Sequence, residues 1–131
     1  MNGVRGMDDR ADGTDEIRMP AGTLLAAASV ALEHVPVESD QVVAGAPTTG
    51  HLVIDEEPGR TVGVWEMTPG AMRDVEADEV FVVLAGAATV EFEHPTLAPI
   101  VLAPGSLVRL EASMRTVWTV RQTLRKVYVA P

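Results

Sequence analysis

Glu79 is the residue of this chain with the strongest case for chemistry. It opens the run 79–84, in which Phe81 and Val83 share its face and the opposite face is also apolar. Such a strand is expected to be buried on both sides, so its carboxylate needs a partner or a mouth open to water. A carboxylate positioned in this way can act as a general base or as a ligand.

Other polar and aromatic side chains could share a cavity with Glu79. Thr116 and Trp118 lie on one face of the extended run RTVWTV, and Lys126 and Tyr128 do the same in RKVYV. Aromatic residues make up only 4% of the chain, so each one is a possible site residue. The candidate ligand-binding residues are Arg73, Thr116, Trp118, Lys126 and Tyr128.

Three further acids, Asp74, Glu76 and Asp78, precede Glu79 in the chain. They lack the alternating oxygen donors, the glycine and the distant glutamate of a calcium-binding loop. We interpret these three acids as a solvated, acid-rich loop that follows the Thr-Pro-Gly turn.

The three histidines of the chain do not have the spacing of metal ligands. His34 is expected at the surface, and His94 in a solvated turn before a proline. His51 opens a strand, and it is the one histidine that could face the mouth of a cavity.

Short strands must position these residues. From residue 48 onward, runs rich in Val, Thr and Leu alternate with Gly, Pro and acidic breaks. The runs are HLVID, TVGVWEM, EVFVVL, ATVEFE, IVL, SLVRL, RTVWTV and LRKVYVA. Turns that recur about every ten residues predict an antiparallel all-β sandwich or barrel. The segment 22–32 is either a short helix capped by Thr23 or a turn followed by an edge strand.

Length and composition limit the function classes. The chain has 131 residues, which suffice for one domain with a single core, and its net charge is -9. Binding to nucleic acid or to an anionic membrane needs clustered positive charge, so neither partner is expected. The absence of cysteine excludes disulfides and thiolate chemistry.

The N-terminal segment differs in composition from the rest of the chain. Residues 1–20 hold five acids and three arginines without an apolar period, which predicts a flexible acidic tail before a single domain at 21–131. The apolar run 21–32 follows acidic residues, unlike a secretion signal, and it is too short to span a bilayer. A cytoplasmic protein is expected.

Several of these pieces together resemble a known family. VGVWEMTPG, the spacing of Glu79 and Gly86, VWTV and LRKVYV are similar to the small single-domain cupins related to the cupin domain of (S)-ureidoglycine aminohydrolase. The resemblance implies a cupin-type double-stranded β-helix, a jelly-roll barrel that usually assembles as a dimer. Such cupins include hydrolases, isomerases and proteins of unassigned activity, so the fold leaves the function open.

The metal-ligand positions of the cupin motif are not retained. In the general motif two histidines precede the glutamate, and these positions correspond here to Arg73 and Val75. In the ureidoglycine enzyme's variant, the four ligands correspond to Arg73, Val75, Glu79 and Thr116. A divalent ion needs several convergent donors, and Glu79 alone is suitable. We therefore expect no metal or other cofactor, with Arg73 or Lys126 replacing the metal's charge beside Glu79.

Two functions fit these observations. The first is a cupin that binds a small polar molecule in its barrel without a metal. The second is an enzyme, either a ureidoglycine aminohydrolase-like hydrolase or a sugar isomerase, with Glu79 as base or ligand. The site could also be vestigial. A homodimer is expected because pairing protects sheet edges, with residues 22–43 helping to cover the partner.

Overall fold

The computed structural model describes residues 17–131, which form strands and no helix. The all-β prediction is therefore confirmed. In this part of the chain, no helix of the length and apolarity that a membrane crossing requires is found. The strands are β1 (His34–Pro36), β2 (Val42–Ala44), β3 (Thr48–Glu57), β4 (Arg60–Met67), β5 (Gly70–Val75), β6 (Glu79–His94), β7 (Ile100–Leu102), β8 (Leu107–Leu110) and β9 (Arg115–Ala130).

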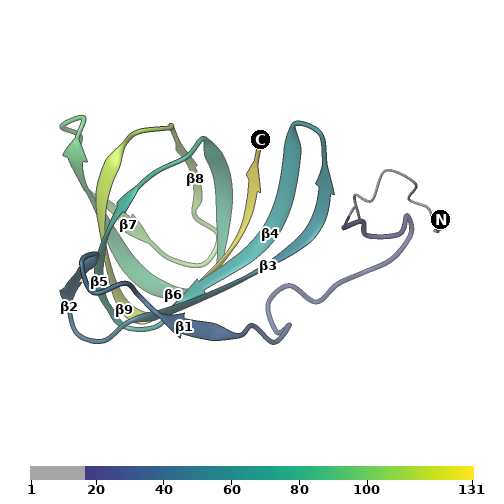
Figure 1. Ribbon diagram of the computed structural model, residues 1–131, viewed down its shortest axis with the longest axis horizontal. Coiled ribbons are helices and arrows are strands. Elements are labelled where there is room, and N and C mark those ends of the chain that lie inside the picture. Colours follow the sequence, from purple (N-terminus) through teal and green to yellow (C-terminus); the bar gives the residue numbers. More distant parts are fainter. Residues whose placement is uncertain (1–16) are drawn as a thin grey trace.

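All strand pairs are antiparallel, and the sheet curls into a barrel (Figure 1). The long strand β9 is part of the barrel wall. The first half of β9 pairs with β5 and the second half with β4, while β6 pairs along both halves. On its other edge β6 pairs with β7 and β8. This arrangement is the jelly-roll barrel that the family resemblance implies, and it agrees with the antiparallel barrel predicted from the strand pattern.

Gly86 explains the spacing of the glutamate and glycine in the sequence motif. It lies where the register of β6 against β9 shifts, and its backbone has a φ of 100°. A Cβ atom there would lie 2.2 Å from the carbonyl oxygen of Thr123. Only glycine fits such a close approach of two backbones, so this position bends β6 across the barrel.

The core lies inside the curled sheet and is built from alternate residues of the strands. Its largest fully buried side chains are Trp118, Phe81, Met67, Leu102, Leu110 and Leu124. The expectation that 79–84 is buried on both sides is wrong for the outer face, because Val80 is 41% exposed.

One local interpretation of the sequence needs correction, and the structure decides between two alternatives for another segment. The first part of the acid-rich loop placed after the Thr-Pro-Gly turn is strand β5, because residues 70–75 pair with 115–120 of β9, whereas residues 76–78 form the connection to β6. Pairing with a neighbouring strand outweighs the weak strand propensity of this run. Of the two alternatives for the segment 22–32, the turn followed by an edge strand is observed, because the segment contains turns and leads to the edge strand β1.

The predicted flexible tail falls mostly on residues 1–16, which lie outside the described residues. Residues 17–20 of that prediction contact β3. The backbone N–H of Glu56 donates to the carbonyl of Ile17, and the N–H of Met19 donates to the carboxylate of Asp55.

Candidate functional site

A cavity of about 220 Å³ opens inside the barrel and contains most of the predicted site residues. The side chains that line it come from β3, β4, β5, β6, β9 and the turn between β5 and β6. They are His51, Trp65, Asp74, Glu76, Glu79, Trp118, Lys126 and Tyr128. The structure thus brings together Glu79, Trp118, Lys126 and Tyr128. Thr116 is fully buried next to Glu76.

Lys126 is the cation that lies beside Glu79. Its Nζ donates to Oε2 of Glu79 at 2.5 Å, and both side chains are largely buried. The alternation of β9 points Lys126 inward, between its register partners Trp65 on β4 and Val83 on β6. Since Glu79 begins β6, the ion pair joins two strands at the wall of the cavity.

Aromatic rings surround the same ammonium group. Nζ of Lys126 lies 4.8 Å from the ring centroid of Trp65, 4.2 Å from that of Phe81 and 4.9 Å from that of Trp118. Each ring face attracts a cation. Lys126 is also the only lysine in the sequence, which otherwise uses arginine for its basic residues. The cavity therefore holds one compact positive charge, the ammonium group of Lys126, in a fixed position.

Glu76 is held by two neutral donors. Its Oε2 accepts hydrogen bonds from Oγ1 of Thr116 at 2.6 Å and from Nε1 of Trp118 at 3.0 Å. The residue is only 8% exposed. Thr116 and Trp118 thus orient a buried carboxylate toward the cavity.

Among residues 17–131, Asp74 is the group with the largest resolved change in pKa. It sits opposite Thr116 in the pairing of β5 with β9, which turns its side chain inward. Burial first, and then the negative charges of Glu76 and Glu79, raise the pKa of Asp74 to about 6. The interpretation of Asp74 and Glu76 as solvated loop residues is therefore wrong, whereas Asp78 is exposed as expected.

Arg73 is not brought together with the other candidate residues. Strand alternation turns it to the outer face of β5, where its side chain is 55% exposed and lies 3.8 Å from Glu93. Val75 also lies on the outer face and is 66% exposed. The two positions that correspond to the histidines of the cupin motif therefore point away from the cavity.

Tyr128 enters the cavity because its neighbour lacks a side chain. Gly63 of β4 is its register partner, and a Cβ atom on Gly63 would lie 2.4 Å from the tyrosine ring. Burial, followed by the charges of Glu79 and Glu56, raises the pKa of the Tyr128 hydroxyl. Tyr128 stays neutral at physiological pH and offers a hydroxyl to the cavity.

The histidines occupy three different settings. His51 lines the cavity at its exposed mouth, whereas His94 is exposed at the end of β6, as expected. His34 is half-buried rather than on the open surface, with Nδ1 2.8 Å from Oγ1 of Thr48 and Nε2 2.7 Å from Oε1 of Glu66.

Three residues of the cavity were not predicted from the sequence, namely Asp74, Glu76 and Trp65. Trp118 faces inward and pairs with β5, so the alternation of side chains along β5 would have placed Asp74 on the inner face. This step requires knowing that residues 70–75 form a strand. Composition offered another signal, because four of the five aromatic residues of the chain gather around Lys126, Phe92 being the exception.

The donors present do not fit a metal ion. Within residues 17–131, no three histidine or acidic side chains come close enough together to hold one. The ammonium of Lys126 lies against Glu79, and Oε2 of Glu76 is occupied by Thr116 and Trp118. A divalent cation would have to displace a fixed positive charge.

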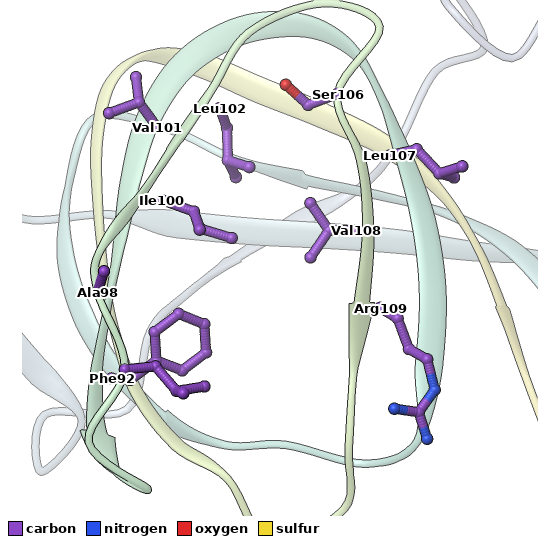
Figure 2. A pocket seen from close by; sticks show the side chains of 10 residues that line it. Phe92, Ala98, Ile100, Val101, Leu102, Ser106, Leu107, Val108 and Arg109 are labelled. Carbon is purple, nitrogen blue, oxygen red and sulfur yellow. The ribbon is translucent and has the colours of Figure 1, made fainter.

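A second cavity of about 500 Å³ lies against β7 and β8, and it differs in chemistry (Figure 2). Phe92, Ile100 and Val108 point toward its centre. The hydroxyl of Ser106, one of its few polar groups, already accepts the backbone N–H of Ala103. A specific site needs convergent polar groups, so the smaller cavity around Lys126 is the candidate.

The comparisons with known proteins agree with the barrel. The sequence model of a family described as EutQ-like cupin domain matches residues 55–128. The search of curated proteins found no match.

Three solved structures show the same fold at low identity. The EutQ protein of Clostridium difficile is 18% identical, with 73% of this chain and 79% of that chain covered and a TM-score of 0.57. A DUF861-family protein of unknown function from Pseudomonas syringae pv. tomato is 17% identical, with 79% and 46% covered and a TM-score of 0.66. A cupin superfamily protein from Desulfitobacterium hafniense is 12% identical, with 89% and 97% covered and a TM-score of 0.58.

Proposed function

We propose that this chain, which belongs to the family of EutQ-like cupin domains, binds a small polar molecule in the cavity around Lys126 without a metal. Family membership establishes the fold, whereas the function has to be inferred from the site. The ion pair of Lys126 with Glu79 carries this proposal. A fixed ammonium inside the barrel supplies the positive charge that a bound metal supplies in metal-dependent cupins.

The composition of the cavity supports a binding role. Aromatic walls with a few convergent polar groups are typical of small-molecule sites. At about 220 Å³ the cavity is smaller than the pockets that hold drug-sized ligands, so its ligand is a small metabolite. The hydroxyl of Tyr128 and the carboxylates of Asp74 and Glu76 supply hydrogen-bonding groups around it.

The proposal is tested by combining metal analysis with ligand-induced melting shifts. Purified protein is treated with a chelator and screened against small cationic, neutral and anionic compounds, with untreated protein in parallel. We expect less than one metal ion per chain, and the same compounds should stabilise both samples. One tightly held metal per chain, together with shifts that vanish after chelation, would overturn the metal-free site.

One observation favours the enzymatic alternative, and it points to Asp74 rather than Glu79. General acid–base catalysis needs a group that titrates near the working pH, and the pKa of Asp74 is about 6. Glu79 already has one oxygen on Lys126. If the protein is a ureidoglycine aminohydrolase-like hydrolase or a sugar isomerase, Asp74→Asn should abolish turnover of the substrate. No turnover in the wild-type protein leaves the binding role.

We also propose that the protein is a homodimer. Apolar side chains remain exposed on the outer face of the barrel, among them Val80 at 41%, Val129 at 43% and Leu107 at 73%. The first two are register partners on β6 and β9. Burial of such a surface against a second copy removes it from water. Light scattering at micromolar concentration should give twice the chain mass, and a monomer would contradict the proposal.

A further inference from the structure

We propose that the ligand of this cavity is a small primary amine, bound as its ammonium ion between the carboxylates of Asp74 and Glu76. The inference rests on the proposed binding function and adds the chemical class of the ligand. It follows from the hydrogen bonds that the two carboxylates lack, from the charge balance of the cavity and from its aromatic walls.

Each of the two carboxylates has an oxygen that no described residue satisfies. Both hydrogen bonds to the side chain of Glu76 go to Oε2, so within residues 17–131 its Oε1 accepts none. Oδ1 of Asp74 accepts the backbone N–H of Val75, and its Oδ2 accepts no hydrogen bond in the same range. Glu76 is only 8% exposed, and a buried carboxylate oxygen without a donor is costly. An added donor inside the cavity would remove this cost.

The charges of the cavity favour a cationic donor. Three carboxylates and one ammonium group line it, which leaves an excess of two negative charges when all are ionised. Lys126 lies directly against Glu79, so the excess resides at Asp74 and Glu76. The rings of Trp65 and Trp118, whose centroids are 5.6 Å apart, also attract a cation. An anionic ligand would meet repulsion from the same groups.

The need for hydrogen bonds selects among cations. The oxygens of Asp74 and Glu76 require N–H donors, and a primary ammonium offers three of them from one small group. A quaternary ammonium carries the same charge without a donor. The two kinds of cation therefore separate hydrogen-bonded recognition from charge attraction alone.

The test is an NMR titration that observes the indole N–H of Trp118, because this group donates to Glu76. Trp65→Phe assigns the two indole signals. The probes are ethylammonium, tetramethylammonium and acetate at constant ionic strength, titrated to about 100 mM because a ligand this small is expected to bind with a Kd of about 1 mM or weaker. Ethylammonium should shift the Trp118 signal to saturation, with tetramethylammonium at least tenfold weaker and acetate without effect.

Charge-neutral variants locate the binding groups. Asp74→Asn and Glu76→Gln should each weaken ethylammonium binding at least tenfold. Glu91→Gln is the matched control, because it removes one exposed carboxylate of β6 outside the cavity and should leave the affinity unchanged. Asp74→Asn carries the test if Glu76→Gln fails to fold, since no buried donor depends on Asp74.

The outcomes separate this inference from the binding function itself. Equal affinity for ethylammonium and tetramethylammonium, or no effect of Asp74→Asn, overturns recognition by hydrogen bonding to the carboxylates. A saturable shift with acetate but none with ethylammonium overturns the amine class and leaves the proposed binding function standing. If no compound of any charge class shifts the Trp118 signal or stabilises the protein, both proposals fail.

Discussion

Consecutive residues of β9 build two charged clusters on opposite faces of one sheet. Lys126 points into the barrel and pairs with Glu79, whereas Arg125 points outward and pairs with Glu66 of β4. Each cluster joins β9 to another strand through a glutamate and a cation. They differ in how completely their polar groups are satisfied.

In the outer cluster every charge has a partner. Nε of Arg125 donates to Oε2 of Glu66, and His34 contacts the other oxygen, Oε1. Arg125 also donates from Nη1 to the carbonyl oxygens of Ala27 and Val30, at 3.0 and 2.7 Å. Burial raises the pKa of Glu66, but the hydrogen bonds from Arg125 and His34 outweigh this effect and lower the pKa. This cluster fastens the N-terminal segment to the barrel.

The inner cluster is unbalanced, since Asp74 and Glu76 add negative charge that Lys126 does not neutralise. The raised pKa of Asp74 is in part a consequence of this excess. A satisfied buried network makes a structure rigid, and an unsatisfied one leaves interactions for a ligand. The contrast supports a structural role for the outer cluster around Arg125 and is consistent with the binding role that we propose for the inner cluster.

The largest expected effect is on the outer cluster. Arg125→Met leaves Glu66 without its main partner and two carbonyl groups without donors, so the free energy of unfolding should fall by about 3–5 kcal/mol. Urea denaturation measures this loss. Arg121→Met is the matched control, because this exposed arginine of β9 donates to the hydroxyl of Thr89, and its effect should stay within about 0.5 kcal/mol. Equal stability of the two variants would contradict the structural role of Arg125.

The next largest effect is expected from Lys126→Met, which removes the ammonium group from among the three carboxylates of the cavity. The loss of stability should be about 3 kcal/mol, at the lower end for a broken buried pair, because methionine keeps contact with the aromatic rings. The double variant with Glu79→Gln should recover part of the loss, since it no longer leaves that carboxylate alone. A single variant as stable as the parent would mean that the ion pair contributes nothing.

Glu79→Gln should lower stability less, by about 1 kcal/mol, because Asp74 and Glu76 still balance the charge of Lys126. Thermal and urea unfolding give the comparison. Arg73→Met serves as the control, since its exposed side chain lies outside the cavity, and its effect should stay within about 0.5 kcal/mol. A loss as large as that of Lys126→Met would show that the other two acids do not support the lysine.

The sequence predicted the parts of the site that depend on local alternation. Lys126 and Tyr128 share an inner face because every second residue of a strand does, and the same rule places Thr116 and Trp118. Gly86 marks the bend of β6 through its backbone geometry. These features can be recognised within a few residues of sequence.

The parts that depend on pairing between distant strands were not predicted. Asp74 faces inward only because β5 pairs with β9, and nothing in the run AMRDV indicates that partner. Arg73 was placed in the site by counting along a motif, but the counted position lies on the outer face. The contact of Arg125 with residues 27 and 30 spans most of the chain, so no local pattern indicates it.

The last expected effect is a gain of stability rather than a loss, and it separates the two clusters by pH. The pKa of Asp74 is about 6 in the folded state, against 3.8 for an unperturbed aspartate, so ionised Asp74 destabilises the fold above pH 6 and ceases to do so as the pH falls toward 3.8. Glu66 has the opposite sign, because its stabilisation is present above the ordinary glutamate pKa of 4.5 and is lost in acid. Asp74→Asn should therefore stabilise the protein at pH 8 by about 1–2 kcal/mol, allowing for screening by water, and should give no gain at about pH 3.5. Urea denaturation across this pH range measures the difference. A gain that is the same at every pH would arise from packing, and no gain at pH 8 would show that Asp74 is not strained by its neighbours.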